Sequence, residues 1–345
     1  MSLGNSFKSI LRSGLISASA ALLGAAAVSA EELNLYTSRE PALVEPLLAA
    51  FTAETGVTVN TVFLKDGLIE RLVSEGESSP ADLLMAVDVG NLLDLVERGL
   101  TQPVESEVLK AAIPANLRDA GNQWFALSMR ARVVYAAKGL DLGALKYSDL
   151  ADPKFKGKIC IRSGQHPYNT ALIAAYISHY GEEAAKTWLE GVKANLARQA
   201  GGGDRDGAKD ILGGICDLAV GNSYYVGLMR SGKGGDEQKL WGEAIEVVLP
   251  TFDNGGTHVN ISGAALAKHA PHKDNAVKLL EFLVSDEAQK LYGEANFEYP
   301  VKAGAALDPI VASLGTLKVD DLPLADFVKH RKAASELVDN VGFDN

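Results

Sequence analysis

Two kinds of apolar pattern alternate along the first hundred residues after position 30. Short apolar runs predict strands, and segments with apolar residues every three or four positions predict helices. The strands are expected at 33–37, 57–64 and 82–87, and the helices at 42–54, 67–74 and 91–98. This alternation predicts a mainly parallel α/β sheet. Ligands of such sheets lie beyond the carboxyl ends of the strands, where Ser38, Arg39, Glu40 and Asp88 fall.

A long extended run, WFALSMRARVVYAA at 124–137, predicts a strand that passes from one domain into another. After it the strand and helix patterns resume, and residues 257–266 are a second extended segment that returns the chain. A single long helix is expected at 274–295 and a last one at 323–338. We therefore predict an α/β protein of two discontinuous lobes joined by crossing strands. The first lobe is 31–132 plus 258–300, and the second is 133–257 plus 301–345.

The first thirty residues have the pattern of a secretory signal. Lys8 and Arg12 precede an apolar stretch, and Val28-Ser29-Ala30 is a small-residue cleavage site, so we predict export to the periplasm and cleavage after Ala30. The full chain has a formal net charge of −11, and loss of the two basic residues makes it about −13. This acidic balance argues against nucleic acid as a partner.

The two cysteines, Cys160 and Cys216, predict one disulfide in an exported protein, and two buried free thiols are the alternative. The sequence contains no CxxC, HExxH, GxSxG or P-loop motif. Because no nucleophile and base occur in a recognisable arrangement, we predict that the protein is not an enzyme.

The pair Tyr224-Tyr225 follows a short apolar strand and a turn in which Ser223 is the expected helix N-cap. At the first turn of a helix both phenols can lean toward one point, near the positive end of the helix dipole. We interpret them as ionised ligands of a hard metal ion. Tyr168 stands at a similar strand-to-helix junction. The alternative is packing, with one tyrosine in the core and the other on the surface.

Arg130 and Arg132 are two positions apart on the long strand, so they share a face and are expected to meet an anion or a carboxylate. A purely structural bridge between the lobes is the alternative. Asn222, in the turn before the tyrosine pair, either hydrogen-bonds an anion or only serves the turn.

Several motifs together give a family resemblance over essentially the whole chain after residue 30. They include LYTSRE, PADLLMAVDVGNL, WFALSMRARVVYAAK, RSGQHPYNTAL, AVGNSYYVGLM and THVNISGAAL. The chain resembles the periplasmic ferric-ion-binding proteins, which are the extracytoplasmic components of iron-uptake ABC transporters. The resemblance implies a type II periplasmic solute-binding fold, capture of Fe(III) by lobe closure, and delivery to an inner-membrane ABC permease. We expect a monomer.

The resemblance also assigns roles to residues. It implies that Tyr224 and Tyr225 bind Fe(III), that Tyr168 is a third ligand, and that carbonate binds as a synergistic anion near Arg130 and Arg132. Fe(III) is hard and prefers oxygen donors, and a bound cation can deprotonate a phenol, whose ordinary pKa is about 10. Three phenolates would neutralise the charge of Fe(III).

The sequence departs from the family pattern on the first lobe. Where the family usually has a histidine, this chain has Glu40 followed by Pro41, and Val87 stands where some members have a glutamate. Either Glu40 is the replacement ligand, or the anion and water complete the shell. A second hypothesis is a solute-binding protein for a polyamine, thiamine or phosphonate, with the tyrosines as stacking walls.

Overall fold

The computed structural model describes residues 31–345. The predicted signal segment and its cleavage site after Ala30 lie outside the described residues. Within 31–345 the strands are β1 (Glu32–Thr37), β2 (Thr58–Phe63), β3 (Leu83–Val87), β4 (Thr101–Gln102), β5 (Phe125–Ala137), β6 (Ile159–Cys160), β7 (Leu218–Asn222), β8 (Ile245–Val248), β9 (Val259–Ala267) and β10 (Tyr299–Pro300).

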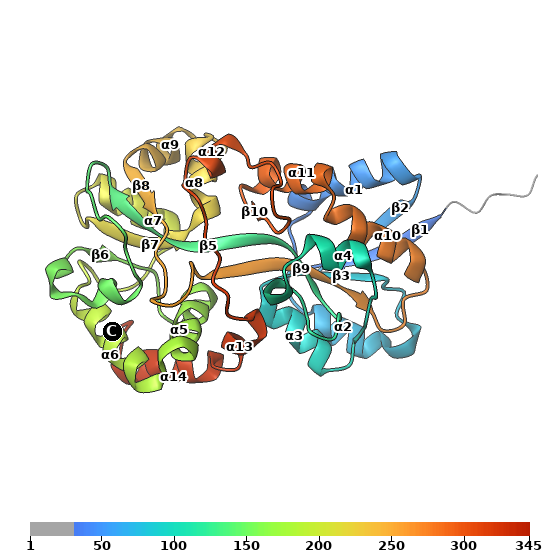
Figure 1. The fold of residues 1–345 in the computed structure, drawn as a ribbon, viewed down its shortest axis with the longest axis horizontal. Coiled ribbons are helices and arrows are strands. Elements are labelled where there is room, and N and C mark those ends of the chain that lie inside the picture. Colours follow the sequence, from blue (N-terminus) through green and yellow to red (C-terminus); the bar gives the residue numbers. More distant parts are fainter. Residues whose placement is uncertain (1–30) are drawn as a thin grey trace, which may run out of the picture. The chain divides into compact units, whose positions relative to one another are not determined.

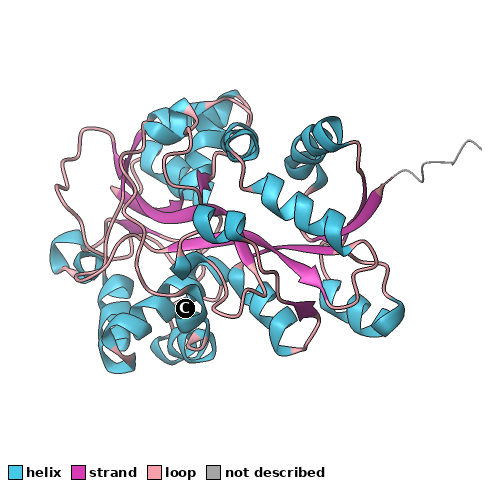
Figure 2. Ribbon diagram, turned by 45° about the vertical axis from the view of Figure 1, so that its right-hand side comes forward, coloured by secondary structure: helices cyan, strands magenta, loops and turns pink. Residues whose placement is uncertain are grey.

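Helices cover both faces of the sheet (Figures 1 and 2). The helices of the described residues are α1 (Pro41–Thr55), α2 (Leu68–Glu75), α3 (Val89–Glu97), α4 (Glu107–Ala112), α5 (Pro167–Tyr180), α6 (Glu182–Ala194), α7 (Asp204–Leu212), α8 (Ser223–Arg230), α9 (Asp236–Glu243), α10 (Lys273–Leu283), α11 (Asp286–Asn296), α12 (Pro309–Ala312), α13 (Leu324–Val328) and α14 (Arg331–Val341). Of these described helices, none is long and apolar enough to cross a membrane.

The strands are ordered β2-β1-β3-β9-β5-β7-β6. The predicted strand–helix alternation gives the parallel pairs β1–β2 and β1–β3. The prediction of a mainly parallel sheet is nevertheless wrong. Since the chain runs out along β5 and returns along β9, these two strands pair antiparallel with each other, and β9 also pairs antiparallel with β3.

The long strand β5 belongs to two sheet regions, as the extended run predicted. Its first half pairs with β9 and β10, and its second half pairs with β7 and β8. Figure 1 shows β5 and β9 running side by side between the two helix-covered regions. Crossing strands of this kind confirm the two-lobed α/β architecture. The lobe boundaries given above stay a prediction.

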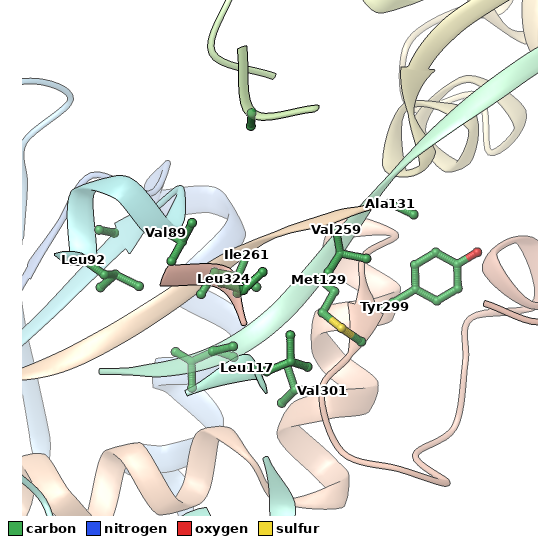
Figure 3. Close-up of a cluster of buried hydrophobic side chains, with 14 of the residues drawn as sticks. Val89, Leu92, Leu117, Met129, Ala131, Val259, Ile261, Tyr299, Val301 and Leu324 are labelled. Atoms are coloured by element: carbon green, nitrogen blue, oxygen red, sulfur yellow. The ribbon is translucent and has the colours of Figure 1, made fainter. Parts of the chain in front are cut away.

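Apolar side chains pack around the crossing point (Figure 3). Met129 of β5, Val259 and Ile261 of β9 and Leu324 of α13 are all at most 6% exposed. Helix α13 packs against both α3 and α5. Burial of this apolar surface stabilises the region where the two parts of the sheet meet.

Two helices predicted as continuous are interrupted, so those predictions are wrong. The segment expected as one helix at 274–295 divides into α10 and α11, because Ser285 starts a new helix and its Oγ accepts a hydrogen bond from the Ala288 amide at 3.2 Å. Serine favours such capping over a helix interior. The last predicted helix likewise divides into α13 and α14, which meet at Lys329 and His330.

Candidate functional site

The tyrosine pair stands at the start of α8, directly after β7. Tyr224 and Tyr225 are half-buried, with ring centroids 4.1 Å apart and ring planes inclined by 36°. The expected N-cap is corrected by one residue: Asn222 is the cap and Ser223 is the first helical residue. The Ser223 hydroxyl accepts a hydrogen bond from the Ala131 amide of β5 at 3.2 Å, so it ties the helix start to the crossing strand.

Tyr168 reaches the same place from the start of α5. Its hydroxyl oxygen lies 3.4 Å from that of Tyr224. The N-cap of α5 is His166, whose Nδ1 accepts a hydrogen bond from the Tyr168 amide at 3.2 Å. Burial lowers the pKa of His166 to about 4, so its ring is neutral at pH 7 and able to accept this bond. The two helix starts thus bring Tyr168 to the tyrosine pair from 56 positions before Tyr224.

Burial raises the pKa of Tyr224 well above its ordinary value, and the neighbouring phenols of Tyr168 and Tyr225 raise it further. The pKa of Tyr225 is also raised, mainly by burial. Both phenols are therefore protonated at neutral pH unless a cation displaces the protons.

A buried ionic network lies beneath the phenols. Arg132 donates from Nη1 to Asp204 at 2.6 Å and to the Asn222 side-chain oxygen at 3.1 Å, and from Nη2 to the Asn169 side-chain oxygen at 2.6 Å. Asp204 also accepts from the Asn222 amide at 2.9 Å. The predicted carboxylate partner of Arg132 is therefore Asp204. Through its hydrogen bonds to Asn222 and Asn169, Arg132 joins the end of β7 to the start of α5.

Arg130, unlike Arg132, lines a pocket next to the tyrosines. It is 4% exposed, and its Nη2 donates to the Ile261 carbonyl of β9 at 2.6 Å. Together with Tyr168 and Tyr224 it lines a pocket of about 270 Å³. The remaining lining residues are Ser38, Arg39, Glu40, Leu43, Val87, Leu228, Ala295, Asn296, Phe297 and Glu298.

The wall opposite the tyrosines comes from the β1–α1 turn and the end of α11. Glu40 is exposed and occupies the N-cap position of α1, but its side chain makes no capping hydrogen bond. Arg39 next to it is buried, pairs with Glu298 at 2.8 Å and donates to the Ser262 hydroxyl. Burial acts to lower the pKa of Arg39, but the charge and hydrogen bond of Glu298 and the nearby phenols of Tyr292 and Tyr224 together outweigh it, so the pKa is raised.

Sequence reasoning placed Arg39 in the expected ligand region but gave it no role, and it did not identify Glu298 as a site residue. Arg39 lies in the LYTSRE motif, and Glu298 begins the segment EYPV at 298–301. The pairing itself joins positions 259 apart, which no local pattern could indicate. Asp88, by contrast, is not among the pocket's lining residues: it caps α3 and pairs with Arg331 at 2.7 Å.

The predicted disulfide between Cys160 and Cys216 is confirmed, with Cα atoms 5.9 Å apart. Cys160 ends β6, and Cys216 precedes β7 rather than lying within a strand. Strands β6 and β7 pair in parallel, so the bridge joins the two segments that lead to the tyrosine turns. Across residues 31–345, His, Cys, Asp and Glu side chains form no cluster of three or more that could hold a metal.

Comparisons with known proteins agree with this architecture. The model of the bacterial extracellular solute-binding protein family matches residues 78–319. Iron uptake protein A1 of Synechocystis sp. is 40% identical over 318 residues, covering 91% of this chain and 88% of the relative.

Two solved structures are similar throughout. A Bordetella ferric binding protein is 63% identical with a TM-score of 0.89, and the match covers 91% of this chain and 100% of that one. A Trichodesmium protein in complex with iron and citrate ligands is 41% identical with a TM-score of 0.85, covering 90% and 99%. The chain therefore belongs to the bacterial extracellular solute-binding proteins, and within them to the family of these iron uptake and ferric-binding proteins.

Proposed function

We propose that this protein captures Fe(III) outside the cytoplasm and delivers it to an inner-membrane ABC permease. The observation that carries the proposal is that Tyr168 and Tyr224 line one pocket with their hydroxyl oxygens 3.4 Å apart, while the ring of Tyr225 lies 4.1 Å from that of Tyr224. Phenolate is a hard oxygen donor suited to a small trivalent cation. The similar proteins are named for iron uptake and ferric binding, which supports Fe(III) as the cargo.

In this proposal Tyr168, Tyr224 and Tyr225 are the principal ligands. Their three negative charges balance those of Fe(III), and the cation supplies the driving force that removes the phenol protons. The raised pKa values of Tyr224 and Tyr225 keep both groups neutral before the cation arrives, which limits repulsion in the pocket.

In this proposal the opposite wall completes the coordination of Fe(III). Glu40 is the proposed protein ligand there, since it lines the pocket, is exposed and has no capping bond. Arg130 is the residue proposed to hold a synergistic anion such as carbonate, because Arg132 and Asn222 already bind each other and Asp204. Movement of the two walls toward each other about the crossing strands would enclose the ion.

Iron loading tests the proposal directly. The purified chain is incubated with citrate-bound Fe(III), freed of excess, and examined by metal analysis and visible absorption. We expect one iron per chain and a visible band from phenolate-to-iron charge transfer. A colourless protein with no iron would overturn the proposal. Calorimetric titration with a polyamine, thiamine or 2-aminoethylphosphonate then tests the alternative of stacking walls.

The cellular part of the proposal has its own test. We propose that residues 1–30 direct export and are removed after Ala30, and that the mature monomer acts in the periplasm. Mass spectrometry of the exported product should give a first residue of Glu31, and light scattering should give the mass of one chain. Stimulation of a reconstituted permease by the iron-loaded form would establish delivery.

A further inference from the structure

Phe297 has a backbone conformation that is uncommon for an aromatic residue. It follows the last residue of α11 with φ 55° and ψ 30°, in the left-handed region, and its amide donates to the Gly293 carbonyl at 2.8 Å. Non-glycine residues occupy this region at a cost, and they do so where surrounding contacts enforce it. The side chain is only 4% exposed.

The contact that buries Phe297 is with the helix of the tyrosine pair. A Cβ atom built on Gly227 of α8 would lie 2.2 Å from Phe297 Cγ, so the ring rests directly on the α8 backbone. Gly227 is three residues after Tyr224, and residues at this spacing share a helix face. Helices α8 and α11 are in contact, and β10 follows the end of α11 in the chain. Phe297 therefore touches the helix that bears two proposed iron ligands.

A second contact reinforces the first. Lys233, in the turn after α8, has its Nζ 4.7 Å from the centre of the Phe297 ring and donates to the Glu294 carbonyl of α11 at 2.9 Å. A cation over an aromatic face and a hydrogen bond to a helix end both favour this arrangement. The end of α11 is thus held to α8 at two points.

The next residue in the chain turns to the opposite wall. Glu298 pairs with Arg39 at 2.8 Å and accepts from the Ser128 hydroxyl, and Tyr299 then pairs with Met129 of β5. Consecutive residues therefore contact the tyrosine helix on one side and the Arg39 wall on the other. Both Phe297 and Glu298 also line the pocket between these walls.

We propose that Phe297 is a positioning residue that sets the separation between the tyrosine helix and the Arg39–Glu40 wall, and thereby the rate at which the bound cation escapes. This inference rests on the proposed function for its cargo. An aromatic ring packed directly against helix backbone is a tight contact, so its loss lets the two walls separate more easily.

Two variants disturb the contact in different ways. Phe297→Ala removes the ring, and Gly227→Ala keeps it but places a methyl group where the ring now lies. Phe51→Ala is the matched control, since it removes a buried ring that packs on Phe282, away from α8. The measurements are the rate of iron transfer to an excess of chelator and the small-angle scattering curve of the iron-free protein.

We expect both test variants to release iron about tenfold faster or more, which corresponds to the loss of roughly one well-packed contact, and to give altered scattering curves. Phe297→Leu should recover part of the retention. The inference is overturned if release stays within twofold of the wild type, or if Phe51→Ala accelerates release equally. Should Phe297→Ala not fold, Phe297→Leu and Gly227→Ala decide. If the wild type takes up no iron, the proposed function fails, and the scattering comparison alone decides about Phe297.

Discussion

The candidate ligands on the two walls of the pocket differ in how firmly the structure supports them. Behind the tyrosines, Arg132 and Asp204 are at most 2% exposed in their side chains and join β5, β7 and α7. On the facing wall Glu40 is exposed at the start of α1, without a capping bond. The difference indicates that the tyrosine wall is preorganised for a cation, whereas Glu40 has to be recruited.

Preorganised ligands contribute more to binding because little order is lost when the ion arrives. We therefore expect substitution of the tyrosines to have the largest effect, substitution in the network behind them the next largest, and substitution of Glu40 the smallest. A different measured order of effects would overturn this ranking.

The largest effect is expected from Tyr224→Phe combined with Tyr225→Phe. Loss of two phenolates removes two of the three proposed charged donors, so iron affinity should fall by about a thousandfold or more, which is about 4 kcal/mol. The visible band should bleach. Tyr36→Phe is the control, since its hydroxyl bonds Glu75 outside the pocket. Retention of the band in the double variant would show that Tyr224 and Tyr225 are not the main iron ligands.

Asp204→Ala should destabilise the fold by about 3–5 kcal/mol, because it leaves Arg132 as a buried charge without its carboxylate. Chemical denaturation gives the free energy of unfolding. The matched control is Asp210→Ala, whose partner Arg198 is partly exposed, with an expected cost of about 1 kcal/mol or less. Equal losses of unfolding free energy in the two variants would show that the network does not stiffen the tyrosine wall.

Reduction of the Cys160–Cys216 bridge should lower stability by about 2–4 kcal/mol, since it frees a loop of 56 residues in the unfolded chain. Because the bridge joins the segments that lead to both tyrosine turns, we also expect faster iron release. Unfolding curves and chelator transfer with and without reductant measure the two effects. Unchanged release after verified reduction would refute the role of the bridge as a clamp.

Iron binding should release protons and weaken as the pH falls. The raised pKa values mean that Tyr224 and Tyr225 are protonated at pH 7 in the iron-free protein, so a cation bound by phenolates must displace both protons. Displacement of at least these two protons per ion corresponds to about a hundredfold or greater loss of affinity for each pH unit lost. Calorimetry in two buffers of different ionisation enthalpy counts the protons, after correction for those of the iron–citrate complex. A count near zero would contradict phenolate ligation.

The smallest effect is expected from Glu40→Gln. An exposed carboxylate that must lose freedom to bind contributes little, so affinity should fall by less than about tenfold. Chelator competition measures the change. A loss of a hundredfold would make Glu40 an equal partner of the tyrosines and overturn the ranking of the two walls.

Much of the fold was predictable because it depends on local periodicity. The strand and helix alternation at 33–98, the crossing strand at 124–137 and the strand-to-helix junctions of Tyr168 and Tyr224 follow from patterns within a few residues. The break at Ser285 was missed because the apolar periodicity continues through it, while a single hydroxyl changes the helix.

Local patterns and residue chemistry predicted the α/β class, a disulfide and the candidate ligands Tyr224 and Tyr225, and the family motifs added Tyr168 as a ligand. The contacts of Arg132 with Asp204, of Arg39 with Glu298 and of Phe297 with Gly227 are visible in the folded chain alone. These contacts join segments 70 or more residues apart. Their geometry follows from how the crossing strands bring the two sheet regions together, and no local pattern encodes it.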